Sequence, residues 1–201
     1  MNWNVIPTFT NPISSTFIDP GICNKLNNLA SNQDWIEDSE EAGTLGATTL
    51  DKYLLDNQPE IGGYIKEKCT DYVIDVLNYQ IDIQLVSSWL TRTYKGGSCQ
   101  QHSHYNSWYS GIIYFSEYDN DSAPIEFYDP VYKSIFPEPF NYNYYNSRSW
   151  RMEPKTNMML IFPSHVQHKV LTHKSEIIRY SLAFNIMPKG TVGHDDSVFE
   201  Y

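Results

Sequence analysis

The segment 100–115, QQHSHYNSWYSGIIYF, carries two histidines one residue apart, followed by an apolar run. In an extended backbone the side chains of residues i and i+2 leave the same face, so the imidazoles of His102 and His104 can converge on one ion. The run that ends at Phe115 is typical of a buried strand. This spacing predicts a metal site at the mouth of a β-structure, with paired surface histidines as the ordinary alternative.

A second segment, 157–185, complements the first with the sequence NMMLIFPSHVQHKVLTHKSEIIRYSLAFN. His168 follows an apolar strand and a Phe-Pro turn, and Arg179 and Ser181 lie farther along, on what reads as another strand. Because strand side chains alternate, Arg179 and Ser181 share one face with small and polar residues, whereas aliphatic and aromatic residues occupy the other face. We interpret the two segments as the halves of one site.

An arginine on an interior strand face requires an anion, because an unmatched buried charge is strongly disfavoured. A carboxylate ligand that docks bidentately on Arg179 meets this requirement, and an ion pair with Glu126 or Asp129 is the structural alternative. Tyr114 shares the face of the histidine pair if the strand runs unbroken, so its hydroxyl could reach the same anion. A bulge at Ser110 would reverse that parity.

The composition favours one β-rich domain. The chain has 201 residues, 15% of them aromatic, and after residue 80 strand periodicity replaces helical periodicity. We expect a mainly β, single-domain fold over residues 1–201. Within it we expect helical support and a lead-in over 1–79, the β core over 80–187 and a tail over 188–201.

Finer elements follow from the apolar spacing and the turn residues. We expect a short strand and irregular lead-in within 3–14, a helix over 20–30, an acidic surface loop over 31–49 and a helix over 60–77 that covers a sheet. The Pro-, Asn- and Tyr-rich segment 132–149 predicts a loop over one end of the core.

Charge and cysteine usage exclude several classes. The formal net charge of −10, from 24 acidic and 14 basic side chains, predicts repulsion from a polyphosphate backbone, so we expect no nucleic-acid partner. Cys23, Cys69 and Cys99 are an odd number at wide spacing, which predicts reduced, packed thiols. The amino terminus has no leader pattern, and no run of about 18 apolar residues is present to span a bilayer. We therefore expect a soluble, cytoplasmic protein with no membrane partner.

The chain has six histidines, and the three outside the predicted triad serve as controls. His173 and His194 occur in polar loop sequence, where a surface or hydrogen-bonded structural role is expected. His165 is three residues before His168, and a turn could bring it near the site.

The order H-x-H, then FP…H, then R-x-S resembles that of the iron(II)- and 2-oxoglutarate-dependent oxygenases. More closely, HSHYNSWYSGIIYF with IEFYDP and FPSHVQHKV…RYSLAFNI is similar to a group of uncharacterised oxygenases of that superfamily, known mainly from bacteria and phages. The resemblance covers residues 80–187. It implies a double-stranded β-helix, which is a jelly-roll or cupin-like core, with supporting N-terminal helices.

Matched residue by residue, the resemblance implies that His102 is the first iron ligand and His168 the distal one. Arg179 matches the clamp on the remote carboxylate of 2-oxoglutarate, and Ser181 matches its hydrogen-bonding companion. We assign Tyr114 to the same cosubstrate site on the strand parity described above.

Position 104 departs from the family pattern, which usually has a carboxylate there. We favour His104 itself as the third ligand, because its side chain has the parity and the length to reach the ion. The alternatives are that Asn106 or Asp129 approaches the metal, or that a coordination position stays open for chloride, as in halogenating relatives.

The resemblance implies an enzyme that binds Fe(II) and 2-oxoglutarate, decarboxylates the cosubstrate to succinate and hydroxylates a small molecule or a protein side chain. It places the protein in a bacterial cell or a phage-infected host, and a homodimer is compatible with the sequence. The rival enzyme class is a cupin-like three-histidine metalloenzyme without 2-oxoglutarate, in which Arg179 binds substrate. The non-enzymatic rival is a jelly-roll carbohydrate-binding module with a Tyr and Trp sugar platform, although sugar binding does not need converging histidines.

Overall fold

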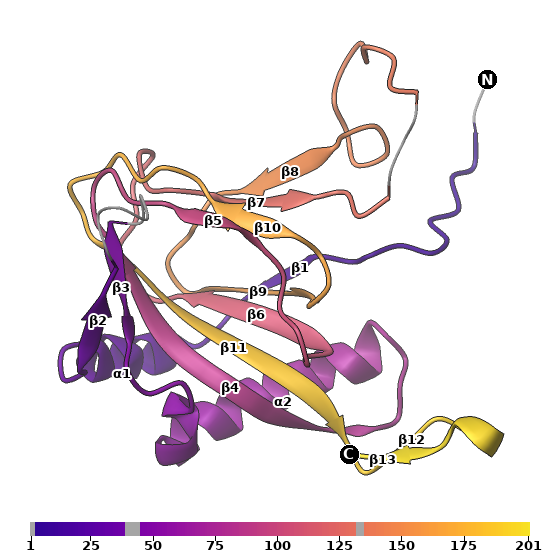
Figure 1. The fold of residues 1–201 in the computed structure, drawn as a ribbon, viewed down its shortest axis with the longest axis horizontal. Coiled ribbons are helices and arrows are strands. Elements are labelled where there is room, and N and C mark those ends of the chain that lie inside the picture. The colour runs from indigo at the N-terminus through magenta and orange to yellow at the C-terminus, as the bar shows by residue number, and fades with distance from the viewer. Residues whose placement is uncertain (1–2, 39–44, 132–134) are drawn as a thin grey trace.

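Two antiparallel β-sheets face each other in a computed structural model that describes residues 3–38, 45–131 and 135–201 (Figure 1). The major sheet contains, in spatial order, β1 (Ser14–Phe17), β9 (Met158–Pro163), β6 (Tyr109–Tyr114), β11 (Arg179–Lys189), β4 (Asp82–Thr93), β3 (Gly46–Thr49) and β2 (Trp35–Glu37). The minor sheet contains β5 (Cys99–His102), β10 (His168–Val170), β7 (Ile125–Tyr128) and β8 (Ser149–Met152). This architecture confirms the predicted mainly β, jelly-roll class.

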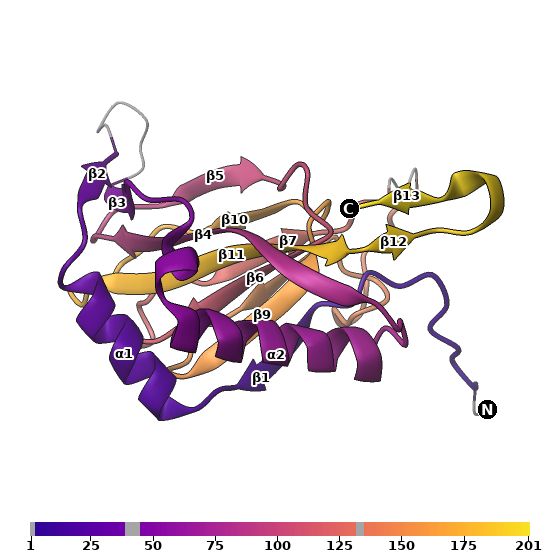
Figure 2. The ribbon, with the colours of Figure 1, turned by 90° about the horizontal axis from the view of Figure 1, so that it is seen from below.

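Both predicted N-terminal helices form, α1 over Pro20–Ala30 and α2 over Pro59–Asp75. Each helix begins with a proline, whose fixed φ suits the first turn and whose missing N–H has no partner to lose there. At the start of α1 the Asp19 carboxylate also accepts a hydrogen bond from the Gly21 N–H at 2.6 Å. Figure 2 shows α2 lying along the outer face of the major sheet, with α1 beside it.

The major sheet separates two hydrophobic cores. The core on the helix side includes Leu26, Ile65, Leu90, Leu182 and Phe184. The core between the sheets includes Ile112, Tyr114, Phe127, Leu160 and Phe162. Alternation along β11 therefore sends Leu182 and Phe184 toward the helices and leaves the intervening residues facing the space between the sheets.

Glycine is required at one point of the helix-side core. A Cβ atom added to Gly111 on β6 would lie 2.1 Å from Cζ of Phe184 on the neighbouring strand. The absence of a side chain at Gly111 thus lets the Phe184 ring pack directly over β6.

Two sequence-based expectations are wrong in detail. The first strand is β1, of which only Ser14 falls within the expected 3–14, because its partner β9 pairs with Ser14–Phe17. The expected surface loop 31–49 contains β2 and β3, which extend the edge of the major sheet through pairing of β3 with β4; its residues 39–44 lie outside the described part.

The expected tail, 188–201, begins with the end of β11 and contains a hairpin of β12 (Thr191–Val192) and β13 (Phe199–Glu200), with the 3₁₀ turn η3 (Asp195–Ser197) between them. Figure 2 shows this hairpin projecting from the body. Short strands of this kind have too few residues for periodicity to indicate them.

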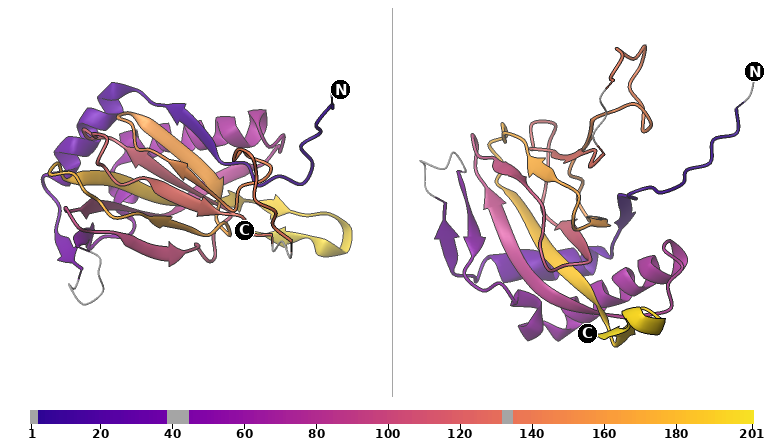
Figure 3. Two further views of the ribbon diagram at one scale, coloured as in Figure 1. Left: turned by 90° about the horizontal axis from the view of Figure 1, so that it is seen from above. Right: turned by 45° about the vertical axis from the view of Figure 1, so that its right-hand side comes forward.

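The remaining described segments lie before α2 and beyond the minor sheet. The 3₁₀ helix η2 (Leu54–Asn57) precedes α2. Within the predicted loop 132–149, residues 135–148 contain no helix or strand, and Figure 3 shows them projecting beyond the minor sheet. Strands β4 to β11 run from Asp82 to Lys189, and the subdivision of the chain at residues 80 and 187 stays a prediction. Among the described residues, no helix has the length and apolar character needed to cross a membrane.

Candidate functional site

Three predicted ligands come together between the sheets at the end of the minor sheet. His102 is the last residue of β5 and His168 is the first of β10, and the two residues pair directly across these strands. His104 lies two residues beyond the end of β5, where its backbone N–H donates to the carbonyl of Ser164 at 2.9 Å. The expected convergence of His102 and His104 on one point is confirmed, and His104 reaches that point from the loop that follows the strand.

The three imidazoles form a compact donor set. Their ring centroids are 4.4 Å apart for His102 and His168, and 5.2 Å for each pair that includes His104. One nitrogen from each ring lies within 4.8 Å of the corresponding nitrogens of the other two. Among the described residues no carboxylate or thiol joins this group, so the alternative ligand Asp129 is not part of it.

Burial and hydrogen bonds to backbone carbonyls favour the binding of a cation by these rings. Burial lowers the pKa of His104 to about 4 and that of His168 to about 3, with the neighbouring imidazoles adding to the effect, so both rings are neutral. Nδ1 of His102 lies 2.8 Å from the Gln100 carbonyl and Nδ1 of His168 lies 3.1 Å from the Val166 carbonyl. A carbonyl only accepts, so Nδ1 carries a proton in both rings, and Nε2 is the nitrogen left to face an ion. Three imidazole nitrogens fit Fe, Cu, Ni or Zn.

A cavity of about 260 Å³ connects the histidines with Arg179. Its apolar walls include Ile112, Ile125, Phe162 and Val170, and Trp89 stands beside His104 with ring centroids 5.9 Å apart. Cavities of this type, apolar with a few convergent polar groups, are the usual form of small-molecule sites.

Arg179, at the start of β11, is only 1% exposed and has neutral partners. Its Nε donates to the Ala123 carbonyl at 3.1 Å, and its two terminal nitrogens donate to the hydroxyls of Ser181 and Tyr114 at 3.3 Å each. Ser181 in turn shares a 2.7 Å hydrogen bond with Thr91, a residue of β4 that the sequence reasoning missed. Tyr114 reaches Arg179 even though a loop interrupts the strand between it and the histidine pair.

No carboxylate of the described residues forms an ion pair with Arg179. The structural alternative, pairing with Glu126, is wrong, because Glu126 binds Arg151 at 2.9 Å and Lys169 at 3.3 Å. Asp129 forms no ion pair with Arg179 either. A buried guanidinium without a counter-charge is the condition under which an anionic ligand binds.

The three control histidines differ from one another. His194 is exposed beside Asp195, and His165 is exposed with its Nε2 2.9 Å from Oδ1 of Asn11, outside the metal-ligand group. His173 is fully buried and hydrogen-bonded through both ring nitrogens. Its polar sequence context gave no sign of this burial.

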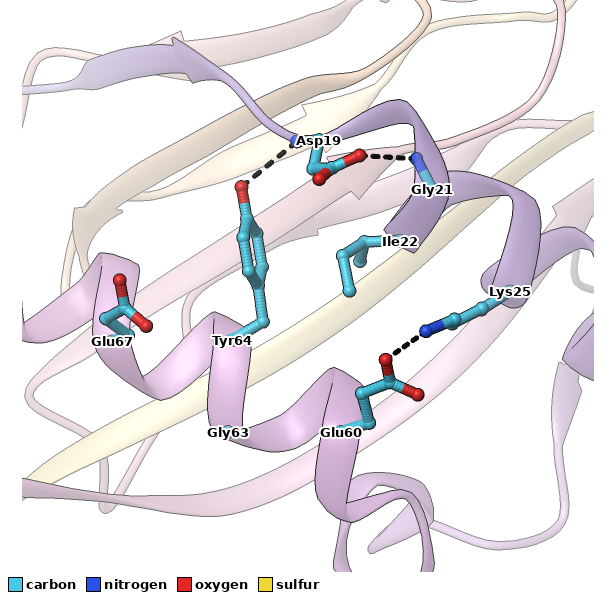
Figure 4. A pocket seen from close by; sticks show the side chains of 8 residues that line it. All are labelled: Asp19, Gly21, Ile22, Lys25, Glu60, Gly63, Tyr64 and Glu67. Atoms are coloured by element: carbon cyan, nitrogen blue, oxygen red, sulfur yellow. Dashed lines mark hydrogen bonds and ion pairs between the residues drawn. The ribbon is translucent and has the colours of Figure 1, made fainter.

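A second pocket lies on the opposite side of the major sheet, between α1 and α2 (Figure 4). Its polar groups bind one another: Lys25 pairs with Glu60, and the Tyr64 hydroxyl accepts the Asp19 N–H at 3.0 Å.

The three cysteines are free thiols, and Cys99 lines the cavity between the sheets. The chemistry-bearing residues are thus concentrated in that inter-sheet cavity.

Residues 87–185 match a family model described as "Putative 2OG-Fe(II) oxygenase". This span contains every predicted ligand and cosubstrate residue, from His102 to Ser181. No curated protein sequence matches the chain.

Solved structures share the fold at low sequence identity. HygX from Streptomyces hygroscopicus, with nickel and 2-oxoglutarate bound, is 12% identical, with a TM-score of 0.65 over 89% of this chain and 84% of its own. The epimerase SnoN from nogalamycin biosynthesis is 8% identical, with a TM-score of 0.65 over 88% and 78%. A Pseudomonas putida prolyl-4-hydroxylase is 13% identical, with a TM-score of 0.59 over 90% and 95%. At these identities the likeness establishes the fold.

Proposed function

Because residues 87–185 match the model of a putative 2OG-Fe(II) oxygenase family, we propose that this protein binds iron(II) through His102, His104 and His168 and oxidises its substrate with 2-oxoglutarate as cosubstrate. The observation that carries this assignment is the pairing, in one cavity, of a three-nitrogen donor set with a buried arginine that has no carboxylate partner among the described residues. When bound, the iron supplies the activation of oxygen that the side chains of proteins do not provide.

The proposed task of Arg179 is to hold the distal carboxylate of 2-oxoglutarate so that its 2-oxo acid end points toward the histidines. A planar guanidinium binds a carboxylate bidentately, and burial strengthens the pair by excluding water. This contribution is one of positioning.

Tyr114 and Ser181 complete the anion site in this proposal. Burial raises the pKa of Tyr114, which keeps its hydroxyl protonated and able to donate to a carboxylate. The Ser181 hydroxyl, held by Thr91 and Arg179, is a second donor at the same point. Both hydroxyls can accept from the arginine and donate to the ligand.

The three-histidine ligand set also affects the net charge of the proposed metal centre. Three neutral histidines leave a divalent ion with its full double charge, whereas a carboxylate ligand would remove one unit. The three-histidine centre would therefore attract the 2-oxo acid end of the cosubstrate more strongly than a centre with a carboxylate ligand would. Arg179 would attract the other end. The apolar walls at Ile112 and Phe162 keep water from competing.

The substrate in this proposal is a small molecule or a protein side chain that enters beside Trp89. Succinate and the hydroxylated substrate are the products. Nucleic acid is not proposed, because the net charge of −10 repels it. Assembly as a homodimer and a cytoplasmic location in a bacterial or phage-infected cell stay predictions, which size-exclusion chromatography and cell fractionation would test.

The experiment is an anaerobic titration of the protein with iron(II) and 2-oxoglutarate, followed by the visible charge-transfer absorption of the complex. We expect one iron and one 2-oxoglutarate per chain. His168→Ala should lose both the metal and the absorption, whereas His194→Ala, at an exposed site, should retain them.

The variant His104→Ala tests the departure from the family pattern. If His104 is a ligand, iron affinity falls sharply and His104→Asp restores it. Unchanged iron stoichiometry in His104→Ala would remove this residue from the set. Iron binding without any response to 2-oxoglutarate would favour the cupin-like enzyme class, in which Arg179 binds the substrate.

A further inference from the structure

We infer that His173 is a positioning residue for the cosubstrate arginine, acting through the backbone of Ala123. This inference rests on the proposed role of Arg179 and extends it to a residue outside the matched motifs. His173 lies in the loop between β10 and β11 and is completely buried.

The hydrogen bonds of the ring fix its protonation pattern. Nδ1 of His173 lies 3.1 Å from the Ala123 backbone nitrogen, whose hydrogen it accepts. Nε2 lies 2.7 Å from the Ile177 carbonyl oxygen, to which it donates. Because an amide only donates and a carbonyl only accepts, the imidazole is neutral, with its single proton on Nε2.

Ala123 connects this ring to the arginine. Its N–H is held by His173, and its carbonyl accepts the Nε–H of Arg179 at 3.1 Å. Pro124 follows it, and the residue before a proline is restricted to extended backbone, so the direction of the N–H constrains the direction of the carbonyl. The orientation of the imidazole is therefore transmitted to Nε of the guanidinium.

The backbone of His173 also joins the segments that surround the arginine. The backbone of His173 donates to the Gly97 carbonyl at 2.8 Å and accepts from the Gly96 N–H at 2.7 Å, which ties the turn between β4 and β5 to the loop before β11. A carboxylate binds bidentately to the two terminal nitrogens, each of which keeps one N–H besides its hydrogen bond to Ser181 or Tyr114, and the fixed Nε contact sets the orientation of the guanidinium plane.

Two amide substitutions at His173 test the roles of its two ring nitrogens separately. The oxygen of asparagine can take the place of Nδ1 and accept the Ala123 N–H, whereas the amide of glutamine reaches the place of Nε2 and leaves Ala123 without its acceptor. We expect His173→Gln to weaken 2-oxoglutarate binding by about 5- to 10-fold, which corresponds to the loss of one buried hydrogen bond and of the alignment it maintains. His173→Asn should stay within about twofold of the unaltered protein.

The readout is the dissociation constant by calorimetry for the anaerobic, iron-loaded protein, with two probes. The first is 2-oxoglutarate, and the second is 2-oxobutyrate, which has no distal carboxylate. A positioning role predicts that His173→Gln weakens binding of the first probe alone. The matched control is His194→Gln, the same substitution at an exposed site, which should change neither constant.

Each result has one meaning. Equal weakening for both probes, or 2-oxoglutarate binding by His173→Gln at the strength of the unaltered protein, overturns the inference about His173. If Arg179→Ala itself leaves 2-oxoglutarate binding unchanged, the proposed function fails at the arginine, which distinguishes that failure from this one.

A measurement without any variant applies if His173→Gln does not fold. Nitrogen-15 NMR of the metal-free protein reports which imidazole nitrogen of each histidine carries the proton. We expect His173 as the neutral Nε2–H tautomer. A proton on Nδ1 would break the contact with Ala123 and overturn the inference.

Discussion

Arg179 and Glu126 are both charged residues on interior strands, and their surroundings are opposite. Glu126 on β7 is 5% exposed and accepts hydrogen bonds from Tyr128, Arg151 and Lys169. Arg179 on β11 is 1% exposed and contacts one backbone carbonyl and two neutral hydroxyls. The protein supplies the counter-charge of Glu126, whereas no carboxylate of the described residues pairs with Arg179. The charge of Glu126 is therefore structural, and in our proposal the counter-charge of Arg179 comes from a ligand.

The largest expected effect is on the affinity for 2-oxoglutarate. Arg179→Ala should weaken it by about 100-fold or more, because a buried bidentate pair is lost, and Arg179→Lys should recover only part, since an ammonium group cannot donate in parallel to both carboxylate oxygens. Glu126→Gln is the matched control and should bind as the unaltered protein does. Calorimetry under anaerobic conditions measures all four proteins, and equal affinities would make Arg179 a structural residue like Glu126.

Ligand-dependent stability gives the second effect. At a 2-oxoglutarate concentration of 100 times the dissociation constant, the free energy of unfolding of the iron-loaded protein should rise by about 2.7 kcal/mol. At the same concentration the rise for Arg179→Ala should be about 0.4 kcal/mol, since a 100-fold weaker site is only half filled. Anaerobic urea unfolding checks this difference. A full rise in the variant would show that the cosubstrate does not use the arginine.

A smaller effect on the free energy of unfolding should appear at Glu126, and it should not depend on the ligand. Burial tends to raise the pKa of its carboxyl, but hydrogen bonds from Tyr128, Arg151 and Lys169 outweigh burial and lower it to about 2. A depressed carboxyl pKa stabilises the fold above the unfolded value of about 4.3, and that contribution is lost as the pH falls toward 2. Glu126→Gln should therefore cost on the order of 1–2 kcal/mol at pH 7 and little near pH 2.

Chemical unfolding of the two proteins across this pH range measures the difference. The same cost at both ends of the range would mean that the shape of the side chain, and not its charge, matters at Glu126. The cost should also be unaffected by 2-oxoglutarate, in contrast to that of the Arg179 variants.

Tyr114→Phe should give the smallest effect. It removes one hydroxyl from the anion site while keeping the ring, whose centroid lies 5.1 Å from the arginine. We expect 2-oxoglutarate affinity to fall by about 3- to 10-fold, the value of one hydrogen bond. A loss as large as that of Arg179→Ala would indicate that the tyrosine orients the guanidinium. No loss at all would remove its hydroxyl from the cosubstrate site.

Periodicity and local signals were sufficient for the elements that frame the site. The proline starts of α1 and α2 and the alternation along β11 are local properties, so they could be read from the sequence. The same local alternation placed Arg179 and Ser181 on one face. It did not indicate β2 and β3, because short edge strands form only where a long neighbour, here β4, offers free backbone groups.

The sequence by itself determined the class of fold, the pairing of the two histidine segments and the presence of an arginine on an interior strand face. Only the tertiary structure decided which charged groups pair. Glu126 forms ion pairs with Arg151 and Lys169, and Arg179 is hydrogen-bonded to neutral partners. The tertiary structure also decided that His173 is buried against Ala123. Side-chain chemistry and backbone periodicity are local properties of the sequence, whereas hydrogen bonds between loops distant in sequence depend on where the fold of the whole chain places their backbones.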